Sequence, residues 1–439
     1  MAGSETIIVF YEKFTIGSIN LSSSGELSFE YDSRWLGTRG NFPLSITLPL
    51  QTGLFANEVI APWLANLLPE EEQLIALSHA LGLATSDALA ILREIGGDTA
   101  GAISIGEPSI RKDWSYASLQ DHYGKTTESE ALARHFEDLG KRPFLAGEDG
   151  VRLSLAGGQK KTALAALDEV GKPRLGLPRP TDRLAIPKNG APSTIIIKPD
   201  NPRLPGIVEN EAYCLALAGL IGLPAAECTI LEADGRTALA VVRYDRTLRS
   251  DDTLRRLHQE DFAQANGIYP GQKYERGTVP GLDMAGLLLT GDHLPPTDAL
   301  ALHDQVIFNI LVANTDAHAK NYSILLGNET SMAPLYDVSS VLHWDHVHQY
   351  HAQKIAGKRR KPADVAPHHW EQIARSAGLN ASAFRRRVSE LIDAMVANRV
   401  EATKRISSLP GAMPEMVEHV AKLVEGNALR VGGRLRAEA

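Results

Sequence analysis

Residues 314–321 read Asn314-Thr315-Asp316-Ala317-His318-Ala319-Lys320-Asn321, and Tyr336-Asp337 follows at the end of a short apolar run. An Asp and an Asn therefore stand five residues apart, with a second Asp further along the chain. Kinase-type phosphoryl transfer needs a carboxylate near the acceptor hydroxyl, and an amide and a second carboxylate that hold Mg²⁺ on the phosphates. The pattern predicts Asp316 as the catalytic residue, with Asn321 and Asp337 as metal ligands. The alternative is a loop whose Asp and Asn side chains cap turns.

The composition limits the class of protein. A chain of 439 residues is too long for one simple core and predicts two or three domains. A net charge of −8 argues against nucleic-acid binding by the whole surface, although a local basic patch stays open. Cys214 and Cys228 are flanked by apolar residues, which predicts buried thiols and not a disulfide or metal pair. With neither a basic-then-apolar leader nor an apolar run of about 18 residues, we expect a cytoplasmic protein without a membrane segment.

Hydrophobic patterning indicates where the first unit begins and ends. Residues 5–31 alternate in short bursts separated by turn residues, which predicts a small antiparallel sheet. Apolar residues at helical spacing follow from Asn57 and again from Ser86, and a strand-like run at 102–105 closes the unit. A polar stretch then leads to a boundary near residue 145.

After this boundary, strand signals come first and helical signals later. We expect strands at 151–155, 194–198, 228–231, 238–244, 322–326 and 333–336, and helices at 209–220, from 296, and within 369–425. Sheet first and helices after, with the polar motif at their junction, is the bilobal order of a kinase. The predicted fold is α+β and kinase-like: a mixed α/β N-terminal domain (1–145), a nucleotide-binding sheet (146–255) and an α-rich catalytic lobe (256–439).

Lys198 ends the apolar run Thr194-Ile195-Ile196-Ile197, which predicts a strand buried on both faces. A lysine there could reach across a cleft to phosphate oxygens. The alternative is a side chain that leaves the sheet edge for solvent, but the polar motif downstream favours the phosphate contact. Glu211, on the following helix, is a candidate ion-pair partner for Lys198; a solvated Glu is its alternative.

The segment Ser154-Leu155-Ala156-Gly157-Gly158-Gln159-Lys160-Lys161, here called the glycine loop, joins two strand-like stretches. Glycines let backbone N–H groups approach phosphate oxygens, and Lys161 could add positive charge. The segment is neither a Walker A sequence nor the glycine-rich consensus of protein kinases. A tight hairpin turn is therefore its alternative.

A histidine cluster follows the polar motif and consists of His343, His346, His348 and His351 beside Asp345. The cluster suggests zinc, but it has no second ligand group at familiar spacing, so a polar loop facing the substrate is preferred. Two basic runs, Lys358-Arg359-Arg360-Lys361 and Arg385-Arg386-Arg387, stand out in an otherwise acidic chain. They predict solvated faces, with contact to nucleic-acid phosphates as the alternative.

Taken together and in order, these motifs resemble the HipA family of bacterial toxin serine/threonine kinases over nearly the whole chain. The polar motif with Leu335-Tyr336-Asp337-Val338 carries most of the resemblance. Supporting segments are the glycine loop, Ile196-Ile197-Lys198, Asn210-Glu211, Arg243-Tyr244-Asp245-Arg246, His258-Gln259-Glu260-Asp261-Phe262 and Leu64-Ala65-Asn66-Leu67-Leu68-Pro69-Glu70.

The resemblance implies a role for each matching residue. Asp316 would be the catalytic aspartate, Asn321 and Asp337 the Mg²⁺ ligands, and Lys198 the lysine on the ATP phosphates. Further ATP contacts would come from Gly157, Gly158, Gln159, Lys161, Val242, Tyr244, His318 and Lys320, with Val242 and Tyr244 at the adenine. Ser154 would be an inhibitory autophosphorylation site. Lys160 and Gly158 depart from the family pattern, which has an acidic residue or proline and a small apolar residue there.

The resemblance also implies a cellular setting, with a HipB-like DNA-binding antitoxin as partner and possible DNA contact within that complex. The protein that this chain phosphorylates would be a translation protein, an aminoacyl-tRNA synthetase. Two other functions stay open at this point: a non-catalytic corepressor that works with such an antitoxin, and a small-molecule phosphotransferase. Intact Asp316, Asn321, Asp337 and Lys198 favour catalysis over the corepressor.

Overall fold

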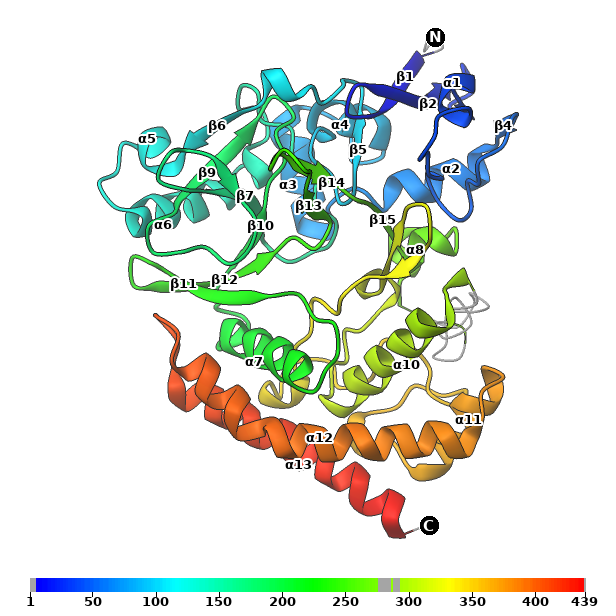
Figure 1. Cartoon of the computed structure of the whole chain (residues 1–439), viewed down its shortest axis with the longest axis vertical. Coiled ribbons are helices and arrows are strands. Elements are labelled where there is room, and N and C mark those ends of the chain that lie inside the picture. Colours follow the sequence, from blue (N-terminus) through cyan, green and yellow to red (C-terminus); the bar gives the residue numbers. More distant parts are fainter. Residues whose placement is uncertain (1–4, 275–285, 287–292, 438–439) are drawn as a thin grey trace.

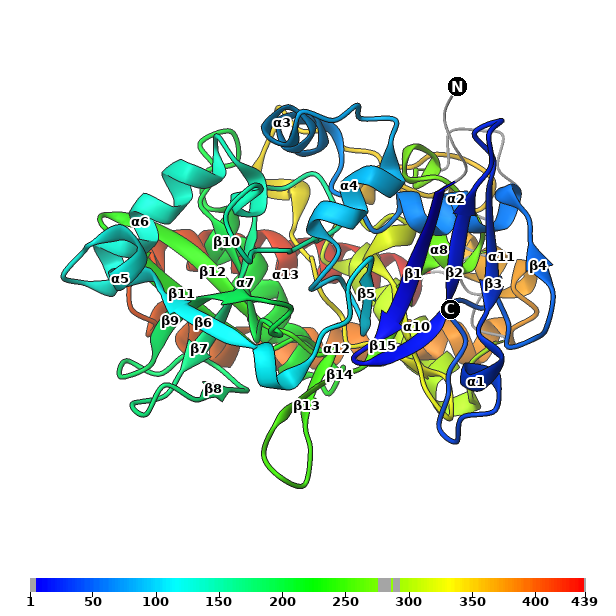
Figure 2. The same ribbon diagram turned by 90° about the horizontal axis from the view of Figure 1, so that it is seen from above.

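The protein is described by a computed structural model that covers residues 5–274, 286 and 293–437. Two sheets lie side by side in one half of the molecule and a helical lobe forms the other half (Figures 1 and 2). This mixed α+β, bilobal arrangement is the fold class that the order of strand and helix signals predicts.

The N-terminal unit begins with the antiparallel sheet expected for residues 5–31. Its strands pair in the order β4-β3-β2-β1-β5. Their bounds are β1 Glu5–Tyr11, β2 Phe14–Leu21, β3 Leu27–Tyr31, β4 Leu54–Phe55 and β5 Ile103–Ile105. The helices of this unit are α1 Ser33–Leu36, α2 Asn57–Ala65, α3 Glu71–Leu81 and α4 Ala88–Ile95. Side chains from the sheet and from α2, α3 and α4 share one hydrophobic core, in which Trp63 and Ile91 are fully buried. The helices predicted from Asn57 and Ser86 are present; α3 was missed.

The second sheet has strand order β11-β12-β10-β7-β9-β6, with β8 paired to β7. The strands are β6 Ser115–Ser118, β7 Thr162–Leu167, β8 Pro173–Arg174, β9 Arg183–Lys188, β10 Ile195–Pro199, β11 Cys228–Ala233 and β12 Arg236–Val242. Because β10 pairs with both β7 and β12, Lys198 lies on an interior strand. The strand predicted at 151–155 is wrong, since this segment runs as a loop with one isolated bridge at Leu153.

Along the chain, the first sheet ends with β5 and the second begins with β6. Helices α5 Leu119–Tyr123 and α6 Glu128–Leu139 share a core with the second sheet, through residues such as Leu132 and Ile197. Helix α6 was not predicted, because its sequence is polar apart from one apolar face.

The helical lobe begins with α7, which packs on the second sheet and on α12 and α13 (Figure 1). The helices of the lobe are α7 Ile207–Leu220, α8 Phe262–Ala265, α10 Pro296–Leu311, α11 Pro367–Ser376, α12 Ala381–Ser407 and α13 Pro414–Ala437. Short strands follow the second sheet along the chain: β13 Arg246–Leu248, β14 Leu254–Arg256, β15 His258–Asp261, β16 Ser323–Leu326 and β17 Ser331–Met332. The strand predicted at 333–336 is wrong in position, because the pairing with β16 ends at Met332.

None of the helices in the described part of the chain is both long and apolar enough to cross a membrane. Cys214 is buried and Cys228 is partly buried, and both are free thiols, as expected.

Candidate functional site

A cavity of about 400 Å³ lies between the second sheet and the helical lobe. The predicted site residues that line it are Gly157, Gly158, Gln159, Lys161, Lys198, Val242, Tyr244, Asp316, His318, Lys320, Asn321 and Asp337. Ser154 is the one predicted site residue that does not line this cavity. The structure thus brings together, in one cleft, residues that are far apart in the sequence.

Asp316 is positioned by the end of α10. The helix stops at Leu311, and Ala313 then takes a left-handed conformation (φ +59°) that turns the chain toward the cleft. The Asn314 side chain stabilises this turn, because its Oδ1 accepts from the Asp316 N–H at 3.1 Å and its Nδ2 donates to Asn309 Oδ1 at 2.8 Å. Asn321 Nδ2 donates to the Asp316 carbonyl at 2.9 Å, so the two predicted residues share one rigid loop.

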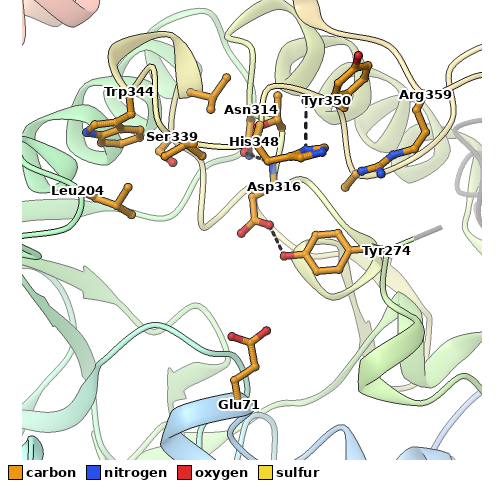
Figure 3. Close-up of a pocket in the computed structure, with 14 residues that line it drawn as sticks. Glu71, Leu204, Tyr274, Asn314, Asp316, Ser339, Trp344, His348, Tyr350 and Arg359 are labelled. Atoms are coloured by element: carbon orange, nitrogen blue, oxygen red, sulfur yellow. Dashed lines mark hydrogen bonds between the residues drawn. The ribbon is translucent and has the colours of Figure 1, made fainter. Parts of the chain in front are cut away.

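Asp316 lies where this cavity meets a second cavity, since its side chain lines both. The hydroxyl of Tyr274 donates to Asp316 Oδ1 at 2.6 Å (Figure 3). The Asp316 side chain is accessible from both cavities. The protein atoms around these cavities nevertheless reduce the hydration of its carboxylate. This desolvation raises the pKa of Asp316 to about 6, and the bond from Tyr274 opposes the rise. Near neutral pH the carboxylate is therefore ionised and able to accept a proton.

Lys198 makes two ion pairs in the cleft. Its Nζ lies 2.6 Å from Glu211 Oε1 and 2.8 Å from Asp337 Oδ1. Burial alone would lower the pKa of Lys198, but the two carboxylates outweigh it and raise the pKa above its usual range. The pKa of Asp337 is in turn held well below its usual range, since Lys198 and Lys161 outweigh its own desolvation. The ion pair expected between Lys198 and Glu211 is confirmed, and it ties α7 to β10.

Several side chains of the cavity could hold a polyphosphate with a divalent cation. Asp337, in a left-handed conformation (φ +56°), and Asn321 offer oxygen ligands of the type that Mg²⁺ prefers. Lys161 lines the same cavity, and no described residue accepts a hydrogen bond from its Nζ or lies within ion-pair distance. Desolvation lowers the pKa of Lys161 to about 8, which an anionic ligand would reverse.

The glycine loop docks on the N-terminal unit. The Glu70 N–H donates to the Gly157 carbonyl at 3.2 Å, and Pro69 forms a parallel bridge with Gly157. Gly157 has φ +101°, and a Cβ there would lie 2.8 Å from Lys161 Nζ, so glycine is needed at this position. The loop is not the tight hairpin that was the alternative, because no strand precedes it.

Ser154 is fully buried, and its hydroxyl donates to the Leu67 carbonyl at 2.7 Å. Its N–H donates to the Asp98 carbonyl at 3.2 Å. In this conformation the hydroxyl is closed off from the cleft, so any phosphoryl transfer to Ser154 requires the glycine loop to leave the N-terminal unit.

Lys320 and His318 line the cavity but have further contacts. Lys320 Nζ lies 3.1 Å from Asp261 Oδ2 and 2.8 Å from Asn66 Oδ1 of the N-terminal unit. Lys320 thus joins the N-terminal unit to the polar motif at residues 314–321, a role that sequence reasoning did not predict. Burial lowers the pKa of His318 well below its usual value, so His318 is neutral at physiological pH.

Val242 ends β12, Tyr244 follows two residues later, and both line the cavity. The Tyr244 ring lies 5.6 Å from that of Tyr336, and its hydroxyl donates to Gln259 Oε1. Aliphatic and aromatic side chains on one wall suit a flat heterocycle, which packs on apolar faces.

The histidine cluster does not converge on one point. His343 lies against His419, His346 donates from Nε2 to the Arg203 carbonyl, and His351 is buried. Within the described ranges, no three His, Cys, Asp or Glu side chains form a metal-binding group. His348 is the member that faces the second cavity, beside Asp316.

Sequence reasoning missed Tyr274 and Asn314 as parts of the site. Asn314 opens the polar motif and could have been recognised, since an Asn after an apolar helix is a common turn-forming residue. Tyr274 has no signal of this kind, because it meets Asp316 only through the folding of a distant segment.

The fold and the site together define a class: a bilobal, kinase-like protein with a paired lysine, a cleft aspartate and two oxygen-bearing side chains around one cavity. The family model described as HipA-like C-terminal domain matches residues 153–399, and that described as HipA N-terminal domain matches residues 7–106. The chain belongs to the HipA family.

Known relatives agree. The Sinorhizobium fredii protein named "Putative kinase Y4mE" is 36% identical over 400 residues, which are 91% of this chain and 91% of that protein. The Shewanella oneidensis serine/threonine-protein kinase toxin HipA is 30% identical over 355 residues, 75% of this chain and 76% of that one. A chain of the solved Shewanella oneidensis HipA, HipB and operator DNA complex matches the fold with a TM-score of 0.80 and 24% identity, covering 98% of both chains. The predicted kinase class and family are therefore confirmed.

Proposed function

We propose that this protein transfers the γ-phosphoryl group of ATP, with Mg²⁺, to a serine or threonine hydroxyl of another protein. The observation that carries the proposal is the meeting of Lys198, Asp337 and Asp316 around one cavity. Lys198 would hold phosphate oxygens, and Asp337 and Asn321 would hold the metal ion. Bound Mg²⁺ would neutralise charge on the phosphates during transfer.

The residues of this chain supply position and proton transfer. Glu211 keeps Lys198 protonated and directed into the cleft, so that its charge is in place before the nucleotide arrives. Asp316 accepts the proton of the incoming hydroxyl, which has to take the place of the Tyr274 hydroxyl on Oδ1. Val242 and Tyr244 would hold the adenine, and the glycine loop with Lys161 would cover the phosphates.

The cellular role is proposed from the family. We propose a cytoplasmic toxin kinase that acts with a HipB-like DNA-binding antitoxin and phosphorylates a translation protein, an aminoacyl-tRNA synthetase. The Shewanella oneidensis structure that shares this fold contains HipA, HipB and operator DNA, which supports an antitoxin partner and contact with DNA within such a complex.

Radiolabel transfer from ATP tests the kinase proposal. The rates of the Asp316→Asn and Asp337→Asn variants should each be about 10²–10⁴-fold lower than the wild-type rate. The first variant loses the proton acceptor, and the second loses a metal ligand. Asp251→Asn is the matched control, since Asp251 is exposed and pairs only with Arg111 and Thr253 at the surface. Equal labelling by all four proteins would exclude this site from the mechanism.

Autophosphorylation on Ser154 is part of the proposal. A phosphate adds about −1.5 to −2 charges to a loop that covers ATP phosphates, so repulsion and loss of the Leu67 contact would expel the loop. Ser154→Ala should therefore stay active under conditions in which the wild type silences itself. Intact-mass spectra after ATP incubation that show no added phosphate near residue 154 would contradict this regulation.

The corepressor alternative would use the basic run at 385–387 on DNA. Arg385 and Arg387 are instead paired with Glu371 and Asp304 of the same chain, which leaves less of their charge for phosphates. The kinase is favoured for this reason. Salt-dependent operator binding that needs these arginines but not Asp316 would restore the alternative.

A further inference from the structure

A second cavity, of about 690 Å³, opens beside Asp316 (Figure 3), and Lys198 is not among the residues that line it. Asp316 and Tyr274 line both cavities, so the two meet at the carboxylate proposed to accept the proton. An acceptor hydroxyl has to reach Asp316 without passing through the nucleotide. The second cavity is the opening that offers this approach.

One end of this cavity is apolar. Leu204, Val341, Trp344 and Val347 line it and are here called the apolar shelf. The Trp344 indole is held in place because its Nε1 donates to the Pro205 carbonyl at 2.9 Å. Figure 3 shows Leu204 and Trp344 together on one side of Asp316. A fixed apolar surface next to a reacting group suits a large aliphatic or aromatic side chain.

The opposite end is basic and aromatic. Tyr350 and Arg359 line it. Together with Lys361, which lies outside the lining but close to the same Tyr350 ring, they are here called the basic rim. Figure 3 shows Tyr350 and Arg359 across Asp316 from Trp344. The Arg359 guanidinium lies 5.9 Å from the Tyr350 ring centroid, and Lys361 Nζ lies 5.3 Å from it. All three residues are exposed, and no acidic side chain in the described ranges pairs with Arg359 or Lys361.

This absence of acidic partners distinguishes the basic rim from the other basic run. Arg385, Arg386 and Arg387 each pair with a Glu or Asp of the same chain. In a protein with a net charge of −8, unpaired cations beside a catalytic carboxylate create a local positive field. Glu71 is the acidic group on the facing wall, and it belongs to the N-terminal unit and not to the rim.

We infer that the second cavity binds the acceptor polypeptide as a linear segment and selects it at two points. A large apolar side chain of the segment occupies the shelf, an acidic side chain contacts Arg359 and Lys361, and the serine or threonine between them reaches Asp316. The inference rests on the proposed kinase function and specifies its acceptor class. Nucleic acid fits less well, because a phosphate backbone offers nothing to the apolar shelf.

A phosphatase-treated peptide library, made by digesting a bacterial proteome, tests the inference. The full-length protein is incubated with the library and ATP, and phosphosites are identified by mass spectrometry. Wild type should favour sites with Asp or Glu on one side and a large apolar residue on the other. Arg359→Glu should reduce transfer to acidic sites about five- to tenfold and raise transfer to basic ones, because attraction becomes repulsion. Trp344→Ala should lose the apolar preference and keep the acidic one.

Arg386→Glu is the matched control, since Arg386 is also an exposed arginine but lies on α12, outside the lining of the second cavity. It should leave the pattern of sites unchanged. Melting temperatures of all variants exclude loss of folding as the cause of a change.

Each outcome is decisive. Sites without an acidic bias, or an unchanged pattern in Arg359→Glu, overturn the inference while the kinase proposal stands. Labelling of intact proteins but of no peptide also overturns it, because the cavity would then not recognise a linear segment. No labelling of proteins or peptides by wild type removes the kinase proposal and this inference with it. Weaker RNA or operator binding by Arg359→Glu, with an unchanged peptide pattern, would assign the basic rim to nucleic acid.

Discussion

Among the buried charged side chains of the described residues, two clusters differ in how completely their hydrogen bonds are made. The arginine cluster consists of Arg243, Arg246, Arg256, Asp98 and Asp245, all with side chains less than 5% exposed. Each of its three guanidinium groups donates from Nε, Nη1 and Nη2 to carboxylates, carbonyls or hydroxyls. Every donor nitrogen in it therefore already has an acceptor within the protein.

The second cluster of charged side chains, here called the cleft cluster, consists of Lys161, Lys198, Glu211 and Asp337. Not all of its hydrogen-bonding groups have a partner among the described residues. Lys198 is held by both carboxylates, but Lys161 donates to none of the described residues and its pKa is lowered to about 8. Asp337 keeps part of its carboxylate open to the cavity.

The comparison separates a structural role from a binding role. Buried ionic groups stabilise a fold only where every donor and acceptor is satisfied, and native proteins leave few such groups unsatisfied. The arginine cluster joins the segment around Asp98, in the N-terminal unit, to the second sheet and the strands that follow it. The open positions of the cleft cluster are those that ATP phosphates and Mg²⁺ would fill.

Removing one charge from the arginine cluster should have the largest effect. The three arginines outweigh the desolvation of Asp98 and hold the pKa of this carboxyl well below its usual range. In Asp98→Asn, all three arginines lose this charged partner. The free energy of unfolding should fall by about 3–5 kcal/mol, as for one partner of a buried ion pair. Chemical denaturation measures this loss. Asp251→Asn, at an exposed pair, should cost less than about 1 kcal/mol; similar costs for both variants would remove the structural role of the cluster.

Removing a charge from the cleft cluster should not lower the free energy of unfolding, in contrast to Asp98→Asn. Lys161→Met deletes a cation without a hydrogen-bond partner, so the free energy of unfolding should hold or rise. ATP affinity should fall about 10- to 100-fold, since a charged hydrogen bond to phosphate is worth about 1.5–3 kcal/mol. Equal losses of stability in Lys161→Met and Asp98→Asn would show that the two clusters do not differ.

The same lysine should make ATP binding depend on pH. With a pKa of about 8 in the free protein, Lys161 is charged below that pH and becomes neutral above it. Phosphate binding requires the charged form, so affinity should decline as pH rises from 7 to 9. Lys161→Arg stays charged in this range and should lose most of the decline; calorimetric titration at several pH values measures both proteins.

The sequence could predict the cleft cluster better than the arginine cluster, for a physical reason. Lys198 and Asp337 come directly after apolar runs, and Asp316 and Asn321 belong to the polar motif that follows another apolar run, so their chemistry and their place near the end of an element are both visible. Arg243-Tyr244-Asp245-Arg246 was recognised only as a family motif, because its partner Asp98 comes from another unit and no local pattern links them.

The N-terminal side of the site escaped prediction for the same reason. Asn66 and Glu70 are polar positions at the end of an apolar stripe, but only the fold brings them to Lys320 and Lys273. The strands predicted at 151–155 and 333–336 were wrong because a short apolar run has the same pattern whether it is buried in a loop or in a strand. Val151 and Leu153 are buried against other segments, without a continuous strand partner.

The smallest predicted effect concerns Tyr274, which meets the cleft without belonging to either cluster. Its hydroxyl donates to Asp316 and lowers the pKa of that carboxyl, which desolvation otherwise raises to about 6. Tyr274→Phe removes this donor, so the pKa should rise by about 0.5–1 unit, the equivalent of one hydrogen bond. Asp316 must be ionised to accept a proton, so the acid side of the pH–rate profile should move to higher pH by the same amount. Tyr123→Phe, whose hydroxyl bonds His135 far from the cleft, should leave the profile in place. A profile that moves equally in both variants, or in neither, would show that Tyr274 does not set the ionisation of Asp316.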